Sequence, residues 1–230
     1  HGQSIRCSSK PSPGYRRAMD ILVVGGHGKV AMRLMKLLAE RGDSPRGIIR
    51  NTEQAGDLEE IGAEPIVLDI ENKEIGDAAA GSDAVVFAAG AGPGSGQARK
   101  RTVDYGGAVN LVEAAQANEI SRYVMLSAIG TNHPERWSGE MGPYYEAKAD
   151  ADRFLIESGL DYTIVRPGRL TNDPGTGKVE VAEDLERSGS VSRDDVAAVI
   201  AEVLLAENTI GKGFDLLNGD TPVADAVRSL

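Results

Sequence analysis

The segment DILVVGGHGKVAMRLMKLLAERG, residues 20–42, constrains the fold more than any other part of the chain. An apolar run is followed by three glycines within four positions, and then by a stretch whose apolar residues recur every three or four positions. This pattern is typical of a buried strand that turns sharply into an amphipathic helix. It predicts a strand at Ile21–Val24, a tight turn and a helix at Lys29–Arg41.

The same alternation of short apolar runs and helical patterns continues to the C-terminus, as expected for a parallel sheet covered by helices on both faces. We predict a doubly wound α/β sheet with strand order 3-2-1-4-5-6, because right-handed crossovers favour that order. The further strands predicted are Gly47–Arg50, Pro65–Leu68, Ala84–Ala88, Tyr123–Leu126 and Tyr162–Val165, with a possible seventh at Phe214–Leu217. The further helices predicted are Glu53–Ile61, Lys73–Ala80, Gln97–Asn118, Tyr144–Ser158 and Arg193–Ala206.

The chain length favours one domain, which we expect to span residues 19–230, with the elements on the substrate side mainly within 168–230. Residues 1–18 carry no acidic residue and no apolar periodicity. We interpret them as a flexible tail, either an expression leader or an upstream extension, with a targeting peptide as the alternative. The segment AAGAGPGSGQ, residues 88–97, predicts a flexible glycine-rich loop.

The composition excludes several classes of partner. A net charge of -10 disfavours nucleic acid, and the apolar runs fall short of the roughly 18 residues that a membrane span needs. The lone Cys7 cannot form an intramolecular disulfide and fits a cytoplasmic location. His1, His27 and His133 are dispersed without ligand spacing, so no metal site is expected. We therefore expect a small-molecule substrate, no nucleic-acid or membrane partner, and leave an oligomer open.

The glycine cluster fits a dinucleotide-binding turn of the Rossmann fold. Gly25 or Gly26 would permit the tight turn, Gly28 would let the backbone approach a pyrophosphate, and Ala31 would let the helix pack closely on the sheet. The helix that follows would offer its N–H groups and positive dipole end to the anion. A plain strand-to-helix turn is the alternative. A Walker-type phosphate loop does not fit, because Val30 stands where a hydroxyl would bind Mg²⁺.

The end of the second predicted strand bears on the choice of cofactor. Arg50 and Asn51 stand about where an acidic residue would bind the ribose hydroxyls of NAD. A guanidinium suits a 2′-phosphate, so we expect NADP, whereas nearby Glu53 keeps NAD open. Lys29 would add a second cation near the phosphates. Asp69 could accept a hydrogen bond from the adenine amino group, or equally cap a helix.

Eight motifs follow one another in a specific order: VVGGHGKVA, Asp69, VVFAAGAG, TVDYGGAVNLVEAA, YVMLSAIGT, YYEAK, DYTIVRPG and SRDDVA. Together they resemble the short-chain dehydrogenase/reductase superfamily, and more narrowly its extended and atypical branches with NAD(P)-dependent epimerase/dehydratase-like and NmrA-like proteins. The resemblance extends from Met19 to the C-terminus.

The resemblance implies that Tyr144 and Lys148 form the catalytic pair. Their spacing of four places both on one face of a helix. A nearby ammonium would lower the pKa of the phenol and make Tyr144 a general acid and base near neutral pH, while hydride passes between a substrate carbon and the nicotinamide. Lys148 would also hold the ribose hydroxyls. Tyr145 is the competing phenol.

Two positions depart from the family pattern. Ser127 or Thr131 would orient a substrate oxygen, although neither falls on the family's position for this hydroxyl. Asp104 stands where the family commonly has an asparagine in the catalytic set, and a carboxylate cannot donate as an amide does. Two functions therefore remain open. One is an NADP-dependent oxidoreductase or epimerase-like enzyme acting on a small carbonyl or hydroxyl substrate; the other is a non-catalytic NADP(H)-binding redox sensor of NmrA-like type.

The resemblance also places the RPG turn after the sixth strand near the nicotinamide. Residues 168–178 are the predicted flexible substrate loop, and Trp137 forms either a lid over the pocket or a cover for the core. The residues predicted to bind the cofactor are Gly25, Gly26, His27, Gly28, Lys29, Val30, Arg50, Asn51, Asp69, Ile70, Ala88, Ala89, Gly90, Lys148, Arg166, Pro167 and Gly168.

Overall fold

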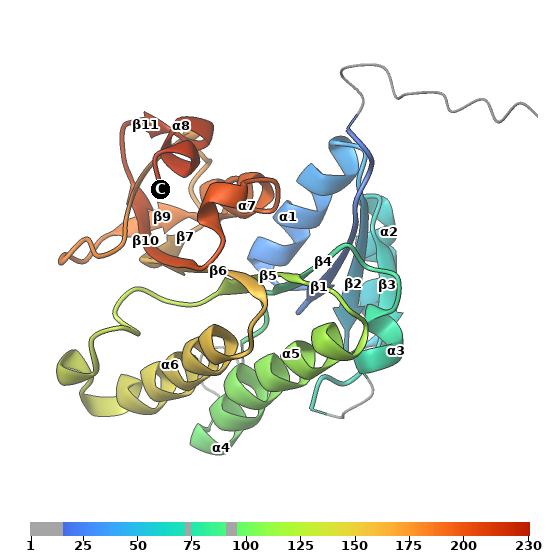
Figure 1. The fold of residues 1–230 in the computed structure, drawn as a ribbon, viewed down its shortest axis with the longest axis horizontal. Helices are drawn as coiled ribbons and strands as arrows, with labels where there is room; N and C mark the ends of the chain where they lie inside the picture. The colour runs from blue at the N-terminus through green and yellow to red at the C-terminus, as the bar shows by residue number, and fades with distance from the viewer. Residues whose placement is uncertain (1–15, 72–74, 91–95) are drawn as a thin grey trace, which may run out of the picture.

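The computed structural model describes residues 16–71, 75–90 and 96–230. Its strands are β1 (Asp20–Val24), β2 (Ser44–Ile49), β3 (Glu64–Val67), β4 (Ala84–Phe87), β5 (Arg122–Leu126), β6 (Asp161–Pro167), β7 (Arg169–Thr171), β8 (Lys178–Ala182), β9 (Ser190–Ser192), β10 (Lys212–Asn218) and β11 (Thr221–Pro222). Nine of them form one sheet in the order β11-β8-β10-β6-β5-β4-β1-β2-β3 (Figure 1). Strands β7 and β9 pair with each other in a separate parallel ribbon.

The predicted order of the first six strands is confirmed, and the sheet is a doubly wound parallel sheet. The possible seventh strand is also confirmed, since Phe214–Leu217 lies within β10, which pairs in parallel with β6. Beyond it, β8 and β11 extend the sheet with antiparallel pairing. The sequence analysis did not predict these two strands, because β8 carries Lys178 and Glu180 among its apolar residues and β11 has only two residues.

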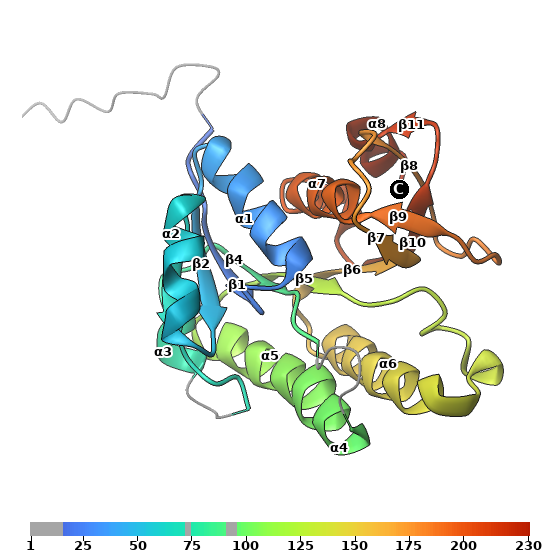
Figure 2. The ribbon, with the colours of Figure 1, turned by 180° about the vertical axis from the view of Figure 1, so that it is seen from behind.

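The helices are α1 (Lys29–Glu40), α2 (Ala55–Glu60), α3 (Ile75–Ala79), α4 (Gln97–Lys100), α5 (Gly107–Ala117), α6 (Gly142–Glu157), α7 (Arg193–Val203) and α8 (Val223–Arg228). Figures 1 and 2 show α1 and α7 on one face of the sheet, and α5 and α6 on the other. The predicted helix Gln97–Asn118 is not continuous, because a π-helical segment, Arg101–Gly106, separates α4 from α5. Three predictions fall partly outside the described residues: the start of the helix Lys73–Ala80, most of the tail 1–18 and part of the loop 88–97.

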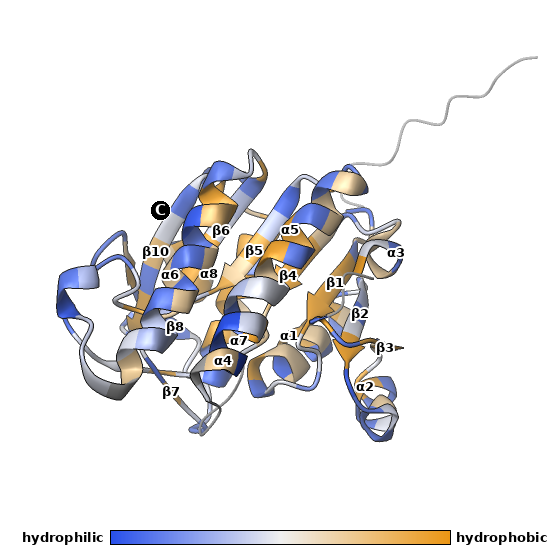
Figure 3. Ribbon diagram, turned by 90° about the horizontal axis from the view of Figure 1, so that it is seen from below, coloured by the Kyte–Doolittle hydropathy of each residue, from blue (hydrophilic) through white to orange (hydrophobic). Residues whose placement is uncertain are grey.

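The core consists of two apolar layers, one on each face of the sheet. In β1, Ile21 and Val23 pack into the layer that contains α1 and α7, whereas Leu22 and Val24 pack into the layer that contains α5. All four side chains are fully buried. Figure 3 shows the central strands as mostly hydrophobic ribbons between the helices. This two-sided burial explains why the strands read as continuous apolar runs.

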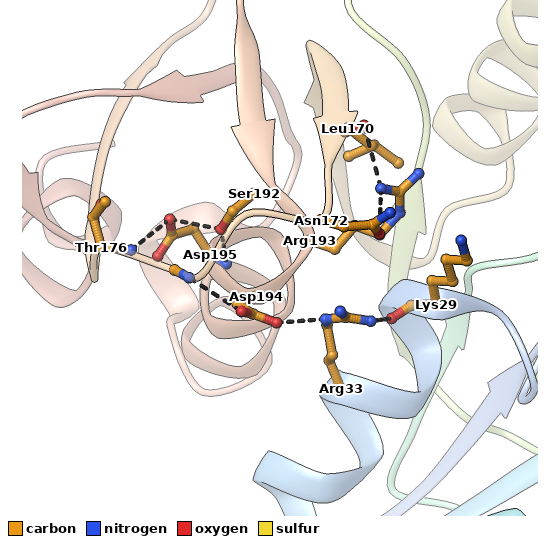
Figure 4. Close-up of polar contacts among 10 residues, drawn as sticks. Lys29, Arg33, Leu170, Asn172, Thr176, Ser192, Arg193, Asp194 and Asp195 are labelled. Carbon is orange, nitrogen blue, oxygen red and sulfur yellow. Dashed lines mark hydrogen bonds and ion pairs between the residues drawn. The ribbon is translucent and has the colours of Figure 1, made fainter.

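The segment 168–178 is held in place by the start of α7 (Figure 4). The Asp195 carboxylate accepts hydrogen bonds from the N–H groups of Thr176 (3.0 Å) and Gly177 (2.8 Å). It also accepts one from the hydroxyl of Ser192 (2.8 Å), which caps α7. Together with the strand β7 inside it, this anchoring corrects the prediction that residues 168–178 form a flexible loop.

Arg193 and Asp194, the two residues before Asp195, also contact the segment 168–178, and Asp194 contacts α1 as well. Arg193 Nη1 donates to the carbonyl oxygen of Leu170 (3.2 Å). Asp194 accepts from the N–H of Gly175 (3.1 Å) and forms an ion pair with Arg33 of α1. Figure 4 shows Asp194 lying between the loop and α1. The start of α7 therefore joins the segment after β6 to the helix that follows the glycine turn.

We predict that Asp195→Ala will release the segment that precedes β8. The substitution removes the acceptor of two backbone amides and one buried hydroxyl, so the free energy of unfolding should fall by about 2 kcal/mol. Hydrogen exchange at Thr176 and Gly177 should accelerate at least about tenfold, because their amides lose a charged acceptor. The control is Asp173→Ala, an exposed carboxylate in the same segment. Equal exchange rates in the two variants would contradict the anchoring role.

Candidate active site

The turn after β1 depends on a close approach of two backbone segments. Gly25 has a φ of 85°, in the left-handed region. A Cβ atom at Gly25 would lie 2.7 Å from the Cα atom of Ala89, which follows β4. Of the two glycines predicted to permit the tight turn, Gly25 therefore provides the left-handed backbone, and no other residue fits between β1 and β4 at this point.

The other two glycines pack against protein backbone as well. The N–H of Gly26 donates to Ile48 of β2 (2.8 Å), and a Cβ atom at Gly26 would lie 3.0 Å from the Cα atom of Gly47. The N–H of Gly28 donates to the carbonyl of Gly25 (2.8 Å), which would lie 2.9 Å from a Cβ atom at Gly28. These contacts close the turn on itself. The approach of Gly28 to a pyrophosphate stays a prediction.

Helix α1 begins immediately after this turn, with Gly28 as its N-cap. The first intrahelical hydrogen bond runs from the N–H of Met32 to the carbonyl of Gly28 (2.9 Å), so the N–H groups of Lys29, Val30 and Ala31 come before it. Such N–H groups, together with the helix dipole, form a binding site for an anion. The side chain of Val30 is buried in the core, so only its backbone faces the turn.

A cavity of about 200 Å³ lies beside the turn, at the carboxyl ends of the parallel strands. The predicted cofactor-binding residues that line it are Gly25, His27, Gly28, Arg50, Asp69, Ile70, Ala88, Ala89 and Gly90. The sequence analysis missed the other lining residues, Ile48, Ile49, Gln54, Leu68, Glu71, Arg99 and Val103. The predicted residues that do not line it are Gly26, Lys29, Val30, Asn51, Lys148, Arg166, Pro167 and Gly168.

Most of the polar side chains that line this cavity come from the glycine turn and from the segments that follow β2 and β3. Arg50 follows β2 and is exposed. The His27 ring lies between Asp57 (Nε2 to Oδ2, 2.7 Å) and Gln54 (Nδ1 to Nε2, 3.2 Å). Asp69 is exposed, lines the cavity and accepts a hydrogen bond from the N–H of Glu71 (3.1 Å) within a local turn, and its contact with an adenine stays a prediction. Among the described residues, Arg50 is one of two exposed arginines that line the cavity, the other being Arg99.

Lys148 of α6 is buried where the central strands β4 and β5 end, with 4% of its surface exposed. Its ammonium donates to the carbonyl oxygens of Leu126 (3.0 Å) and Ala89 (3.4 Å). Leu126 ends β5, and Ala89 follows the neighbouring strand β4. The carboxylate of Asp104 lies 3.6 Å from Nζ. Tyr144 precedes Lys148 by one turn of α6, so both lie on one face of that helix, and their action as a catalytic pair stays a prediction.

The predicted lowering of the Tyr144 pKa is wrong in this structure. Burial raises the pKa of the phenol well above 10, and the negative charge of Asp104 raises it further. Burial is the larger of these two causes, because it disfavours the charged phenolate, and the Lys148 ammonium is turned to two carbonyl oxygens and lies beside Asp104. At neutral pH, Tyr144 is therefore a protonated phenol.

The sequence analysis missed Asp152, a buried carboxylate that engages both candidate helper hydroxyls. Ser127 (2.8 Å) and Thr131 (2.9 Å) each donate to its Oδ2 atom, and Arg166 Nε lies 3.7 Å away. Burial raises the pKa of Asp152. Because each hydroxyl donates its hydrogen bond to Asp152, Ser127 and Thr131 could only accept a hydrogen bond from a substrate hydroxyl while this arrangement is kept. The signal for Asp152 was its position four residues after Lys148, on the same face of α6.

The RPG turn and the aromatic cover of α6 lie away from the cavity. Arg166 is 9% exposed and faces Asp152. A Cβ atom at Gly168 would lie 2.4 Å from Leu217, so this turn is packed against β10. Trp137 stacks on Tyr145 with ring centroids 6.4 Å apart, which places it over the first turn of α6. The predicted approach of the RPG turn to a nicotinamide stays a prediction.

Within the described ranges, no helix is long and apolar enough to cross a membrane. No group of three or more His, Cys, Asp or Glu side chains among these residues is arranged to hold a metal ion.

Comparison with known proteins identifies the family that this site belongs to. Residues 25–207 match the model of an NAD(P)H-binding family. The chain is 43% identical over 215 residues to the Bacillus subtilis protein named "Uncharacterized sugar epimerase YhfK", an alignment that covers 92% of this chain and 100% of that protein. The chain belongs to this family of NAD(P)H-binding proteins.

Solved structures agree with this assignment. A Bacillus halodurans protein described as an NAD-dependent epimerase/dehydratase has 44% identity and a TM-score of 0.89, over 93% of this chain and 100% of that chain. A Lactococcus lactis oxidoreductase has 31% identity and a TM-score of 0.81, over 92% and 96% of the two chains. The similarity covers both ends of the site, from the glycine turn to α6.

We predict that Gly25→Ala will destabilise the protein far more than Gly42→Ala. Both residues have positive φ, 85° and 87°, but a Cβ atom at Gly42 meets nothing within 4 Å. Gly42→Ala should therefore cost only backbone strain, about 1 kcal/mol. Gly25→Ala adds a collision with Ala89 and should cost roughly 3 kcal/mol. Chemical denaturation measures both, and equal losses would contradict the close approach of β1 and β4.

Proposed function

We propose that this protein is an NADP-dependent oxidoreductase or epimerase-like enzyme that acts on a small carbonyl or hydroxyl substrate by hydride transfer. The observation that carries the proposal is the arrangement of Tyr144 one helical turn before the buried Lys148. The Lys148 ammonium contacts Ala89, against which the glycine turn packs. A phenol that can move a proton thus lies at the same sheet edge as the turn that would hold a dinucleotide.

The residues around the glycine turn fit an NADP molecule. The first N–H groups of α1 would hold the pyrophosphate, and Lys29 would add a positive charge beside it. The exposed Arg50 guanidinium on the cavity suits a 2′-phosphate, which NAD lacks. When bound, NADPH supplies the hydride. Lys148 would donate hydrogen bonds to the ribose hydroxyls, because its ammonium lies at the ends of β4 and β5.

The names of relatives support the class of reaction. The Lactococcus lactis structure is described as an oxidoreductase, and a 26% identical Escherichia coli structure with a TM-score of 0.75 as an anaerobilin reductase. The Bacillus subtilis relative is named for a sugar epimerase. Reduction of a carbonyl and nicotinamide-dependent epimerisation of a carbinol share hydride transfer at a carbon that bears oxygen, and this shared step is the one we propose here.

We predict that Tyr144→Phe will lower turnover by about 100-fold or more, while the affinity for NADPH is retained. The variant removes the proton that reaches the substrate oxygen and leaves the ring in place. The measurement is NADPH oxidation with a panel of carbonyl compounds, beside calorimetric titration of the cofactor. Tyr145→Phe is the control, because it keeps the ring that stacks on Trp137 and removes the competing phenol.

Three results separate the alternatives for this prediction. Unchanged turnover in Tyr144→Phe would exclude Tyr144 as the proton donor. Loss of turnover in Tyr145→Phe instead would assign the role to Tyr145. Tight NADPH binding by the wild-type protein without turnover of any compound in the panel would overturn the enzymatic proposal in favour of a redox sensor.

We also predict that Arg50→Ala will weaken NADPH binding about 10- to 100-fold and leave NADH binding nearly unchanged. The guanidinium would lose a charge-assisted contact to the 2′-phosphate, and such contacts contribute about 1.5–3 kcal/mol. Titration of both nucleotides measures the effect. Arg228→Ala, an exposed arginine on α8, controls for the change in net charge. Equal affinities of the wild-type protein for NADPH and NADH would contradict the role given to Arg50.

A further inference from the structure

The side chain of His27 lies where the glycine turn meets the chain that follows β2. The preceding residue, Gly26, donates its N–H to the carbonyl oxygen of Ile48 in β2 (2.8 Å), which places His27 beside the end of that strand. Arg50 follows Ile48 by two residues, and both His27 and Arg50 line the cavity. The ring therefore belongs to the part of the cavity wall to which the 2′-phosphate is assigned above.

The two ring nitrogens of His27 have opposite roles. Nδ1 lies 3.2 Å from the amide nitrogen of Gln54, and an amide nitrogen only donates hydrogen bonds. Nδ1 is therefore the acceptor, and the ring proton is on Nε2, which donates to Oδ2 of Asp57 at 2.7 Å. Gln54 lines the cavity and Asp57 does not, so Nδ1 is on the cavity side of the ring.

A second proton, taken up from solvent at Nδ1, would change both the hydrogen bonding and the charge. An imidazolium donates from both nitrogens, so Nδ1 would no longer accept from Gln54, and its N–H would become available to an oxygen atom in the cavity. Asp57 would remain the acceptor of the Nε2 proton. A charged ring and Asp57 would then form a neutral pair, whereas a neutral ring leaves a carboxylate that repels a phosphate.

The remaining charges around the ring come from every element beside it. Among the described residues, the charged side chains that line the cavity, His27 apart, are Arg50, Arg99, Asp69 and Glu71. These two cations and two carboxylates cancel in number. Outside the lining, Lys29 is exposed in the first turn of α1, and Glu53 is exposed in the helical turn Thr52–Gln54. Protonation of His27 therefore decides whether the cavity lining has a net positive charge.

We propose that His27 is a second ligand of the cofactor's 2′-phosphate, and that it binds this group only when its ring carries a second proton. The proposal rests on the function proposed above and adds a regulation of the same site. Histidine usually changes charge between about pH 5 and 8, whereas the guanidinium of Arg50 stays charged throughout. The preference for NADPH over NADH should therefore rise as the pH falls from about 8.5 to 6.5.

The test is His27→Gln, whose side chain gains no proton in this range. The measurement is calorimetric titration of NADPH and of NADH at constant ionic strength. At about pH 6.5 the variant should bind NADPH roughly tenfold more weakly than the wild type, because it lacks a charge-assisted hydrogen bond. At about pH 8.5 the two proteins should agree within about twofold, and their affinities for NADH should agree at both pH values. Because the 2′-phosphate itself takes up a proton near about pH 6, the two proteins are compared at the same pH.

His133→Gln is the matched control. The His133 ring also lies beside carboxylates, with Nε2 2.8 Å from Asp184 and Nδ1 3.1 Å from Glu135, but it does not line the cavity. This variant should keep the affinities of the wild type and their dependence on pH.

The second readout is NMR of the His27 ring in the wild-type protein, assigned through its contact with the Gln54 amide group. The probe is 2′,5′-ADP, which carries a 2′-phosphate without a nicotinamide, and ADP is its control. A ligand that binds the protonated ring about tenfold more tightly must make that ring about tenfold easier to protonate. We therefore expect 2′,5′-ADP to move the titration of His27 to higher pH, and ADP to leave it unchanged.

The outcomes distinguish this inference from the function on which it rests. If His27→Gln binds NADPH as the wild type does, or is weaker by the same factor at both pH values, the proton-dependent role is overturned. Loss of NADPH binding in Arg50→Ala would then still support the proposed cofactor. A His27 titration that is the same with 2′,5′-ADP and with ADP overturns the role even if the variant fails to fold. If 2′,5′-ADP moves the titration but no carbonyl compound is turned over, the role of His27 stands and the enzymatic function fails.

Discussion

The structure around α6 depends on the need to compensate charges that are buried away from water. Lys148 is buried between α6 and the ends of β4 and β5, and an ammonium is stable there only with acceptors around it. Two carbonyl oxygens and Asp104 provide them. Because these partners come from β4, β5 and the π-helical segment, the same compensation fixes where Tyr144 lies relative to the glycine turn.

Asp152, the second buried charged group on this face of α6, also has partners that compensate its charge. Asp152 accepts hydrogen bonds from Ser127 and Thr131 and faces Arg166, which lies beside Asp215 in the neighbouring strand. Burial raises the pKa of both carboxyl groups. One face of α6 thus carries, in order, a phenol, a paired ammonium and a hydrogen-bonded carboxyl. The chemistry available at this edge of the sheet is set by how completely each charge is compensated.

The glycine turn and the C-terminal part of the chain are linked on the opposite face of the sheet. Asp194 joins the segment after β6 to Arg33 of α1, and Asp195 anchors the residues that lead into β8. Helix α1, which would hold the pyrophosphate, therefore shares contacts with elements from residue 168 onward. The two ends of the site are built on one sheet, but different helix layers support them.

The sequence by itself determined the doubly wound sheet, because continuous apolar runs such as Ile21–Val24 are stable only between two helix layers. It also determined the glycine turn and the pairing of Tyr144 with Lys148, since both are local: one needs a left-handed backbone beside a strand, the other a spacing of one helical turn. Only the tertiary structure decided that Asp104 lies against Lys148, that Asp152 accepts the hydrogen bonds of Ser127 and Thr131, and that the pKa of Tyr144 is raised. These properties depend on burial and on residues brought together from separate elements, and neither can be read from spacing along the chain.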